Sequence, residues 1–151
     1  MTTPSAKLAE LGITLPPVVP PVAAYVPGLR SGSYVYTSGQ LPMRDGALPA
    51  TGKVGAAVTP AVGYDLAKQC AINALAVVDS LAGIDAVKRV VKVVGFVASD
   101  PAFTGQPAVI NGASEFLVEV FGEAGQHARS AVGVAVLPLD APVEVELIVE
   151  I

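Results

Sequence analysis

Residues 143–151 have the sequence VEVELIVEI, in which apolar and polar side chains alternate almost without exception. Successive side chains of a β-strand point to opposite faces of the sheet, so this period of two predicts a strand with one buried face. The apolar face takes every second residue, namely Val143, Val145, Leu147, Val149 and Ile151. The other face carries Glu144, Glu146, Ile148 and Glu150.

Residues 129–137 (RSAVGVAVL) precede this strand and alternate in the same way, with Arg129, Ala131 and Gly133 on one face. If the two strands pair as a hairpin with their valine faces matched, Arg129 and Glu144 share the outer side of the sheet. They would then lie at opposite ends, about 24 Å apart at roughly 3.4 Å per residue. Either the two side chains are unrelated, or they meet across a subunit boundary. The small residues Ala131, Gly133 and Ala135 would let another chain approach closely.

The rest of the chain supplies helices and further strands. Helical periodicity predicts helices from Gly63 to Gly83 and from Pro107 to Phe121, and a β-branched run predicts a buried central strand from Val90 to Ala98. The N-terminal part is predicted to form a short helix at Ser5–Leu11, followed by a proline-rich extended arm. A strand is predicted at Gly32–Leu41, and a loop at 42–63 with a short strand near Gly52–Ala57. This order predicts an α+β fold, with a mixed β-sheet and both helices packed on one face. We expect one domain over residues 1–151, with residues 1–24 as an N-terminal arm.

The composition narrows the classes of function. The chain has 151 residues, of which 52% are hydrophobic and 15% charged, with a net charge of −4. This acidic balance argues against nucleic-acid binding, which depends on attraction to phosphates. The apolar surplus suggests burial between subunits. No uninterrupted apolar span of about 18 residues exists for a membrane helix, and the N-terminus lacks a secretory pattern, so we expect a cytoplasmic protein.

The single cysteine and the single histidine limit metal and disulfide chemistry. Cys70 alone cannot form an intramolecular disulfide, and one histidine, His127, excludes a Cys/His zinc cluster. We therefore expect no metal and no cofactor. Cys70 falls on the core face of its predicted helix and should be inert, and His127 is expected on the surface or in a loop.

Residues 36–42 (YTSGQLP) end a strand with residue types that do not belong in a strand interior. One interpretation is that the strand ends so that the Ser38 hydroxyl and the Gly39 N–H face a cleft, because glycine allows close approach to its backbone. The alternative is that Ser38 and Gly39 form only a bulge or a turn.

Three of these motifs together resemble the Rid (YjgF) family of reactive-intermediate deaminases. They are YTSGQLP, the asparagine in VINGASEF at 109–116, and the terminal pattern ARSAVGVAVLPLDAPVEVELIVEI at 128–151. The resemblance runs from about Tyr25 to the C-terminus; Tyr25 precedes Ser38 by thirteen residues, and Arg129 precedes Glu144 by fifteen, as in the family. It implies a chorismate-mutase-like fold, a homotrimer with clefts between neighbouring subunits, and hydrolysis of 2-imino or enamine acids to 2-keto acids and ammonia.

The resemblance also implies roles for individual residues. Arg129 would anchor the substrate carboxylate, since a guanidinium binds such a group with two parallel hydrogen bonds. Glu144 would position or deprotonate the attacking water. Tyr25 and Ser38 would complete the polar lining of the cleft. The Gly39 N–H and the Asn111 amide would contact the ligand. Many relatives carry a cysteine where this chain has Ala131, and the family uses mainly the backbone N–H at that position.

Simpler interpretations of the same residues stay open. Arg129 could be a solvated charge or a salt-bridge partner, Glu144 an ordinary exposed glutamate, and Tyr25 an interface packing residue. Asn111 could be a polar residue on a helix surface. For function, the alternative to a deaminase is a noncatalytic binder of small carboxylates such as 2-keto acids in the same cleft. Ribonuclease activity, sometimes attached to this family, fits poorly with the acidic charge.

Overall fold

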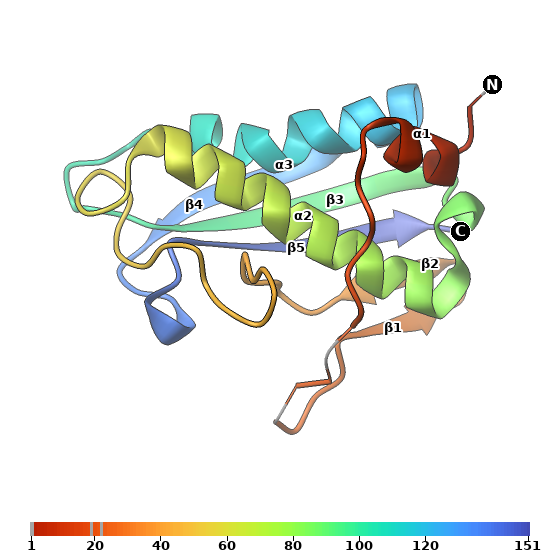
Figure 1. Cartoon of the computed structure of the whole chain (residues 1–151), viewed down its shortest axis with the longest axis horizontal. Helices are drawn as coiled ribbons and strands as arrows, with labels where there is room; N and C mark the ends of the chain where they lie inside the picture. The colour runs from red at the N-terminus through yellow and green to blue at the C-terminus, as the bar shows by residue number, and fades with distance from the viewer. Residues whose placement is uncertain (1, 19, 22) are drawn as a thin grey trace.

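The computed structural model describes residues 2–18, 20–21 and 23–151, and it contains a five-stranded sheet with helices on one face (Figure 1). The strand order is β1-β2-β5-β3-β4, and only the β3–β4 pair is parallel, so the sheet is mixed. The strands are β1 (Gly28–Ser31), β2 (Tyr34–Thr37), β3 (Arg89–Ala98), β4 (Ala128–Val134) and β5 (Val143–Glu150). The predicted α+β fold with a mixed sheet is confirmed.

Two long helices, α2 (Pro60–Ala82) and α3 (Gln106–Phe121), pack against the sheet as expected. Thr59 caps α2 by accepting a hydrogen bond from the Val62 N–H, and a proline follows in the first turn. Each helix ends at a glycine of positive φ, Gly83 and Gly122. The helix predicted from Gly63 therefore begins three residues earlier, at Pro60. Single turns of 3₁₀ helix follow at η1 (Ile84–Ala86), η2 (Gly122–Gly125) and η3 (Pro138–Asp140).

Three expectations about strands need correction. The strand predicted from Gly32 to Leu41 is present but shorter, as β2, and it is the second half of a hairpin, because Gly32, at a φ of 58°, turns the chain between β1 and β2. Strand β1, which follows the arm of residues 1–24, was not predicted. No strand forms at Gly52–Ala57 among the described residues, where Val54 makes only isolated bridges to Val58 and Ser99.

The third error concerns the two C-terminal strands, which do not form a hairpin. Strand β4 runs parallel to β3, and β5 lies between β2 and β3. Positive φ angles at Leu139 and Asp140 redirect the chain in the connection between them. Alternation identifies both segments as strands and gives the buried face of β5, but in β4 the face with Arg129 and Ala131 lies toward α3 and Val132 is exposed. Alternation also does not specify which strand lies beside which, so the hairpin could not be distinguished from this topology by pattern alone.

The core lies between the sheet and the helices. Val93 and Val97 of β3 and Val145 of β5 are fully buried there. The two helices cross at backbone contact, since a Cβ on Gly112 of α3 would lie 2.0 Å from the carbonyl oxygen of Tyr64 in α2. Cys70 is fully buried in α2, and burial raises the pKa of its thiol well above the usual range, which keeps it protonated and inert as predicted.

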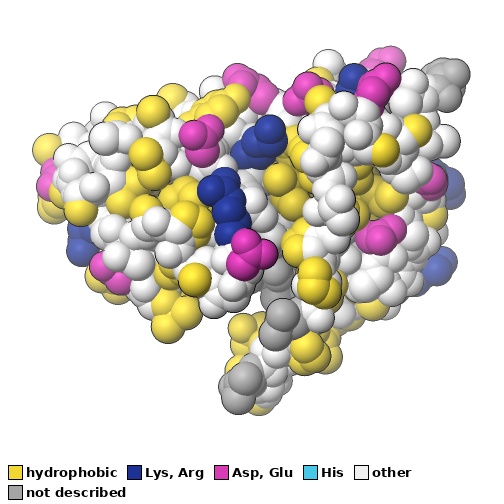
Figure 2. Space-filling view, viewed as in Figure 1, with side chains coloured by type: hydrophobic (Ala, Val, Ile, Leu, Met, Phe, Trp, Pro, Cys, Tyr) yellow, Lys and Arg dark blue, Asp and Glu magenta, His cyan; other side chains and the backbone are white. Residues whose placement is uncertain are grey.

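The N-terminal segment begins with helix α1 (Pro4–Glu10) and then crosses the outer side of α2 (Figure 1). Leu8 is 4% exposed in the core, and the backbone N–H and hydroxyl of Ser5 donate to the Asp85 carboxylate at 2.8 and 2.6 Å. Hydrophobic side chains lie along both sides of the arm where it crosses the helix layer (Figure 2). The arm is therefore held against the body of the chain before it turns back into β1.

The other face of the sheet carries no helix of the described chain and presents large apolar side chains. Tyr34 and Tyr36 of β2 are 40% and 41% exposed, and Leu29 and Val132 are also exposed. The acidic side of β5, with Glu144 and its neighbours, shares this face. An open apolar sheet face of this kind is typical of a surface that packs against another chain.

Among the helices that the structure describes, none combines the length and the hydrophobicity needed to cross a membrane.

The helix crossing predicts that Gly112→Ala destabilises the protein strongly. The added methyl would overlap the Tyr64 carbonyl oxygen, and separating two packed helices costs about 1–3 kcal/mol. Urea denaturation at a fixed protein concentration should show a lower midpoint than wild type. Glu119→Ala, at an exposed position on the same helix, should change stability by less than about 0.5 kcal/mol. Equal midpoints for the two variants would contradict the packing described here.

Candidate functional site

A β-bulge interrupts the pairing of β2 with β5 at the Ser38-Gly39 sequence. Tyr36 pairs with Ile148 and Gln40 pairs with Val145, so that residues 37–39 lie opposite residues 146–147 alone. The Thr37 hydroxyl accepts the Leu147 N–H at 3.0 Å and secures one side of the bulge. Strand β2 therefore ends at Thr37, and the pairing with β5 resumes only at the Gln40 bridge, with one extra residue in between. Bulges of this kind re-aim side chains at functional sites.

Ser38 holds the N-terminal arm at the bulge. Its N–H donates to the Pro27 carbonyl at 2.7 Å, and its hydroxyl donates to the Val26 carbonyl at 2.6 Å. These bonds place Tyr25, which is 59% exposed, beside the bulge. Ser38 thus supports the arm as well as facing the adjoining cavity.

Gly39 lies directly against the Glu144 carboxylate. A Cβ at position 39 would be 2.5 Å from Glu144 Oε1, so any side chain there would force the carboxylate away from its present position. Burial, with a smaller contribution from Glu146, raises the pKa of the Glu144 carboxyl above its ordinary value. A carboxyl that gives up its proton less readily is better suited to exchange a proton near neutral pH.

A cavity of about 580 Å³ adjoins the bulge, between the arm, the segment after β2 and helix α2. Its lining includes the site residues Tyr25, Ser38 and Gly39. The Asn73 side chain of α2 donates to the Leu41 and Met43 carbonyls at 3.0 Å each, and so fixes the segment that forms one wall. The volume is in the range of small-molecule sites.

Arg129 lies in a different place, at the start of edge strand β4 and on the helix-covered side of the sheet. Its Nη1 donates to Asn111 Oδ1 at 2.8 Å and to Ser114 Oγ at 3.1 Å, and its Nη2 donates to the Pro107 carbonyl at 3.2 Å. All three acceptors belong to α3. Asn111 is therefore not a free surface amide, because it holds the guanidinium of Arg129.

Ser114 and His127 extend this group and were not among the predicted site residues. His127 Nε2 lies 2.9 Å from Ser114 Oγ, and its Nδ1 lies 2.6 Å from the Gly125 carbonyl. His127 is half-buried and lies in the short connection between η2 and β4, so the expected loop position is confirmed. Ser114 follows Asn111 by three residues, and this helical spacing, which puts both on one face, is the signal that could have identified it.

Ala131 lies two residues beyond Arg129 on the same face of β4, beside Gly95. A Cβ on Gly95 would lie 2.6 Å from Ile110 of α3, so the helix and the sheet approach closely there. The face of the sheet that carries Ala131 thus packs closely under α3.

One chain does not bring the predicted site residues together. Arg129 of β4 is paired with Val93 of β3, and both side chains lie on the helix side of the sheet. Glu144 of β5 is paired with Phe96 of β3, and both lie on the helix-free side. The expectation that these two charges share the outer side of the sheet, which assumed a hairpin with matched valine faces, is wrong because the face of β4 with Arg129, and not the face with Val132, lies under α3. The structure instead forms two separate groups: Tyr25, Ser38, Gly39 and Glu144 at the bulge, and Arg129, Asn111 and Ala131 at the β4 edge.

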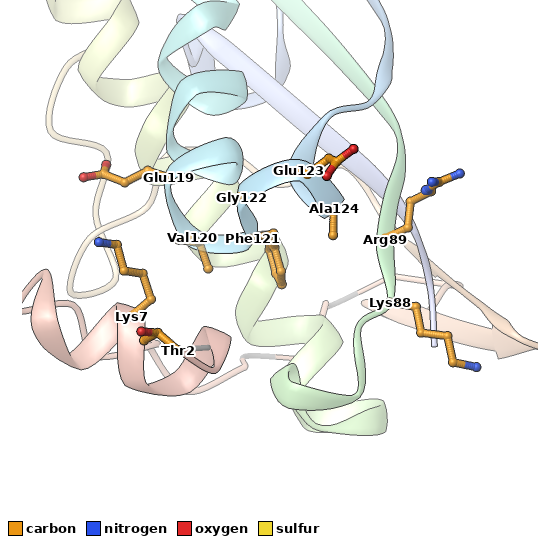
Figure 3. Close-up of a pocket in the computed structure, with 10 residues that line it drawn as sticks. All are labelled: Thr2, Lys7, Lys88, Arg89, Glu119, Val120, Phe121, Gly122, Glu123 and Ala124. Carbon is orange, nitrogen blue, oxygen red and sulfur yellow. The ribbon is translucent and has the colours of Figure 1, made fainter.

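A second cavity, of about 640 Å³, lies at the other end of the molecule, between α1, the end of α3 and the start of β3. Figure 3 shows that Lys88 and Arg89 point away from Lys7 and Glu119. No convergent set of charges forms among its lining residues, so we regard the bulge and the β4 edge as the functional region.

The whole of this architecture matches a known family. The family model described as "YjgF/chorismate mutase-like, putative endoribonuclease" matches residues 5–151. The chain belongs to the YjgF family. This match includes the three motifs at residues 36–42, 109–116 and 128–151, and it also includes helix α1 and the arm.

Three proteins are similar to this YjgF-family chain over most of its length. Protein TCP17 of Trypanosoma cruzi is 46% identical over 149 residues, which is 97% of this chain and 93% of that protein. The crystal structure of Atu1372 from Agrobacterium tumefaciens, of unknown function, is 48% identical, with a TM-score of 0.89 over 99% of this chain and 93% of that one. The structure of Escherichia coli TdcF with bound serine is 29% identical, with a TM-score of 0.66 over 87% of this chain and 91% of TdcF.

The raised pKa of Glu144 predicts that Glu144→Gln stabilises the protein at neutral pH. Because the pKa is higher in the folded state than in the unfolded state, the ionised carboxylate opposes folding above the folded pKa. This penalty disappears below about pH 4, where the group is protonated in both states. Melting temperatures measured from pH 4 to pH 8 should show a gain for Glu144→Gln that grows with pH. Glu150→Gln, on the same face but away from Gly39, is the control, and a pH-independent difference for Glu144→Gln would contradict the prediction.

Proposed function

We propose that this protein hydrolyses reactive 2-imino and enamine acids to 2-keto acids and ammonia, in a cleft formed by two copies of the chain. The observation that carries the proposal is the guanidinium of Arg129. It is held in place by Asn111 and Ser114 and has no carboxylate within ion-pair distance among the described residues. A positioned, half-buried cation without an anionic partner is suited to bind an anionic ligand.

The N–H donors of Arg129 that make no hydrogen bond within the protein are suited to bind a carboxylate. A guanidinium has five N–H donors, and the protein uses three of them in the hydrogen bonds to α3. The other two are available to a small anion. Hydrogen bonds to charged groups contribute about 1.5–3 kcal/mol each, which is enough to orient a small acid without retaining its product.

Glu144 would carry the proton transfers. In the imine reaction, water adds to the carbon of the C=N bond, and the carboxylate takes the proton that this water releases. The same carboxyl then returns this proton to nitrogen, which gives a carbinolamine. A second transfer moves the proton of the carbinolamine hydroxyl to the amino group, the C–N bond breaks, and ammonia leaves as the C=O bond of the keto acid forms. An enamine would first be protonated on carbon. The raised pKa of Glu144 matches this alternation between base and acid.

The two half-sites require a second chain. Within one copy they lie on opposite faces of the sheet, with β3 and β5 between them. The helix-free face, with its exposed Tyr34, Tyr36 and Val132, supplies an apolar surface for such assembly. Different patches on neighbouring copies form a closed ring when the rotation between them closes. We propose a homotrimer in which the Arg129 of one copy faces the bulge of the next.

The comparison with TdcF supports a ligand of this size, because serine carries its carboxylate and its nitrogen on adjacent carbons, as a 2-imino acid does. The same observation also favours a second candidate, a noncatalytic binder of small carboxylates. The endoribonuclease description of the family has less support here. The net charge of −4 and the glutamate at the bulge do not attract a polyanion.

Replacing Arg129 should abolish the hydrolysis. We expect Arg129→Ala to lower kcat/KM at least about 100-fold, because loss of a fully engaged charged pair costs several kcal/mol. Arg129→Lys should recover only a small part, since an ammonium cannot form the bidentate contact. The imine is generated in the cuvette by an amino-acid oxidase, and its loss is followed with each variant and with buffer. The matched control is Arg89→Ala, which removes an exposed arginine from β3.

Equal rates for wild type, Arg129→Ala and buffer would reject catalysis. Calorimetry with pyruvate then separates the two candidates. Arg129-dependent binding without hydrolysis would identify a noncatalytic carboxylate binder.

Mixing two inactive variants should restore activity if the site is shared between chains. Arg129→Ala and Glu144→Ala subunits, unfolded and refolded together in equal amounts, would form some clefts that contain both wild-type side chains. Random assembly around a closed ring predicts about a quarter of the wild-type activity. Each variant refolded alone is the control. A mixture that stays as inactive as its components, although it forms mixed oligomers, would place both residues in the same chain's site.

A further inference from the structure

The cavity beside the bulge has a wall that the N-terminal arm supplies. Four of its lining residues are arm prolines, namely Pro16, Pro17, Pro21 and Pro27. Proline has no backbone N–H, so this wall offers few donors to a ligand, and its φ angle is constrained before any ligand arrives. The arm therefore presents a preformed, largely apolar surface directly opposite helix α2.

The opposite walls are apolar as well. Leu41 and Met43 contribute from the segment after β2, and Ala76 and Val77 from α2. The polar residues of the lining make hydrogen bonds within the protein. Asn73 uses its amide nitrogen on two carbonyls and accepts from Gln69 Nε2 at 3.0 Å, and Gln40 Nε2 donates to the Ser38 carbonyl at 3.1 Å. The interior of the cavity would therefore bind a ligand mainly through apolar contacts and only to a small extent through hydrogen bonds.

The position of the cavity relates it to the proposed chemistry. Ser38 and Gly39 line it at one end, and Gly39 also lies against the Glu144 carboxylate. Gly39 is therefore the residue that the cavity and the Glu144 carboxylate have in common, although Glu144 itself does not line the cavity. A volume of about 580 Å³ is far larger than a methyl substituent needs.

We propose that the arm cavity binds the side chain of the substrate and selects 2-imino acids with a bulky apolar substituent, branched aliphatic or aromatic. This inference rests on the proposed function, since it assigns the substrate class of the same site. The lining also contains Asp45, whose charge disfavours an acidic substituent. Imines derived from leucine or phenylalanine should fit, and those derived from alanine or aspartate should be poorer substrates.

The first test compares imines made by one D-amino-acid oxidase from D-leucine, D-phenylalanine and D-alanine. One methylene in an apolar pocket changes kcat/KM by about 10–200-fold, so the leucine imine should exceed the alanine imine at least tenfold. Ala76→Phe, which fills the cavity from α2, should remove this preference and leave the alanine imine within about twofold of wild type. Ala61→Phe makes the same substitution at an exposed position of the same helix and should leave both rates unchanged.

A second variant keeps the test valid if Ala76→Phe does not fold. Met43→Ala enlarges the cavity from the opposite wall and should lower kcat/KM for the leucine imine while sparing the alanine imine. Rates that are equal for all imines, or that fall uniformly in the variants, would overturn the inference while leaving the deaminase proposal intact.

Absence of hydrolysis with every imine would instead reject the proposed function. The cavity is then tested by calorimetry with 4-methyl-2-oxopentanoate and pyruvate. Tighter binding of the larger acid, lost in Ala76→Phe and kept in Ala61→Phe, would support the side-chain pocket, and equal binding of the two acids would overturn it.

Discussion

The insertion of β5 between β2 and β3 is the constraint on which the rest of the structure depends. This strand pairs with a neighbour on each side and buries Val143, Val145, Leu147 and Val149 under the helices. Its position also decides the chemistry, since it brings the Glu144 carboxylate against Gly39 at the β2 bulge. The same insertion displaces β4 to the edge of the sheet, where Arg129 can reach only α3 within its own chain.

The separation of Arg129 from Glu144 gives a physical reason for assembly. Each group is well formed by itself: the guanidinium is held by Asn111 and Ser114, and the carboxylate lies directly against Gly39, where a Cβ would displace it. Neither half has the complementary charge that a small zwitterion-like substrate would need. Completing the site between copies and covering the apolar face of the sheet would therefore be achieved by the same contact.

The arm gives this chain a feature that acts on the same region. It is secured at one end by Leu8 and by the Ser5 bonds to Asp85, and at the other by the bonds of Ser38 to Val26 and Pro27. Between these anchors it crosses α2 and closes one side of the cavity beside Gly39. A segment that appears in the sequence as a proline-rich extension thus becomes a wall of the candidate site.

Local pattern in the sequence determined the two long helices, the buried strand predicted at Val90–Ala98, the buried face of the last strand and the motifs that resemble the Rid family. It did so because helical periodicity, strand alternation, proline and glycine act over a few residues. Only the tertiary structure decided that β4 pairs with β3, that Ser38 and Gly39 form a bulge, and that Arg129 and Glu144 lie on opposite faces. These are pairings between segments distant in the chain, and the period of two that identifies a strand is the same whichever neighbour it takes. For the same reason Ser114 and His127 acquired their connection to Arg129 only when α3 packed against β4.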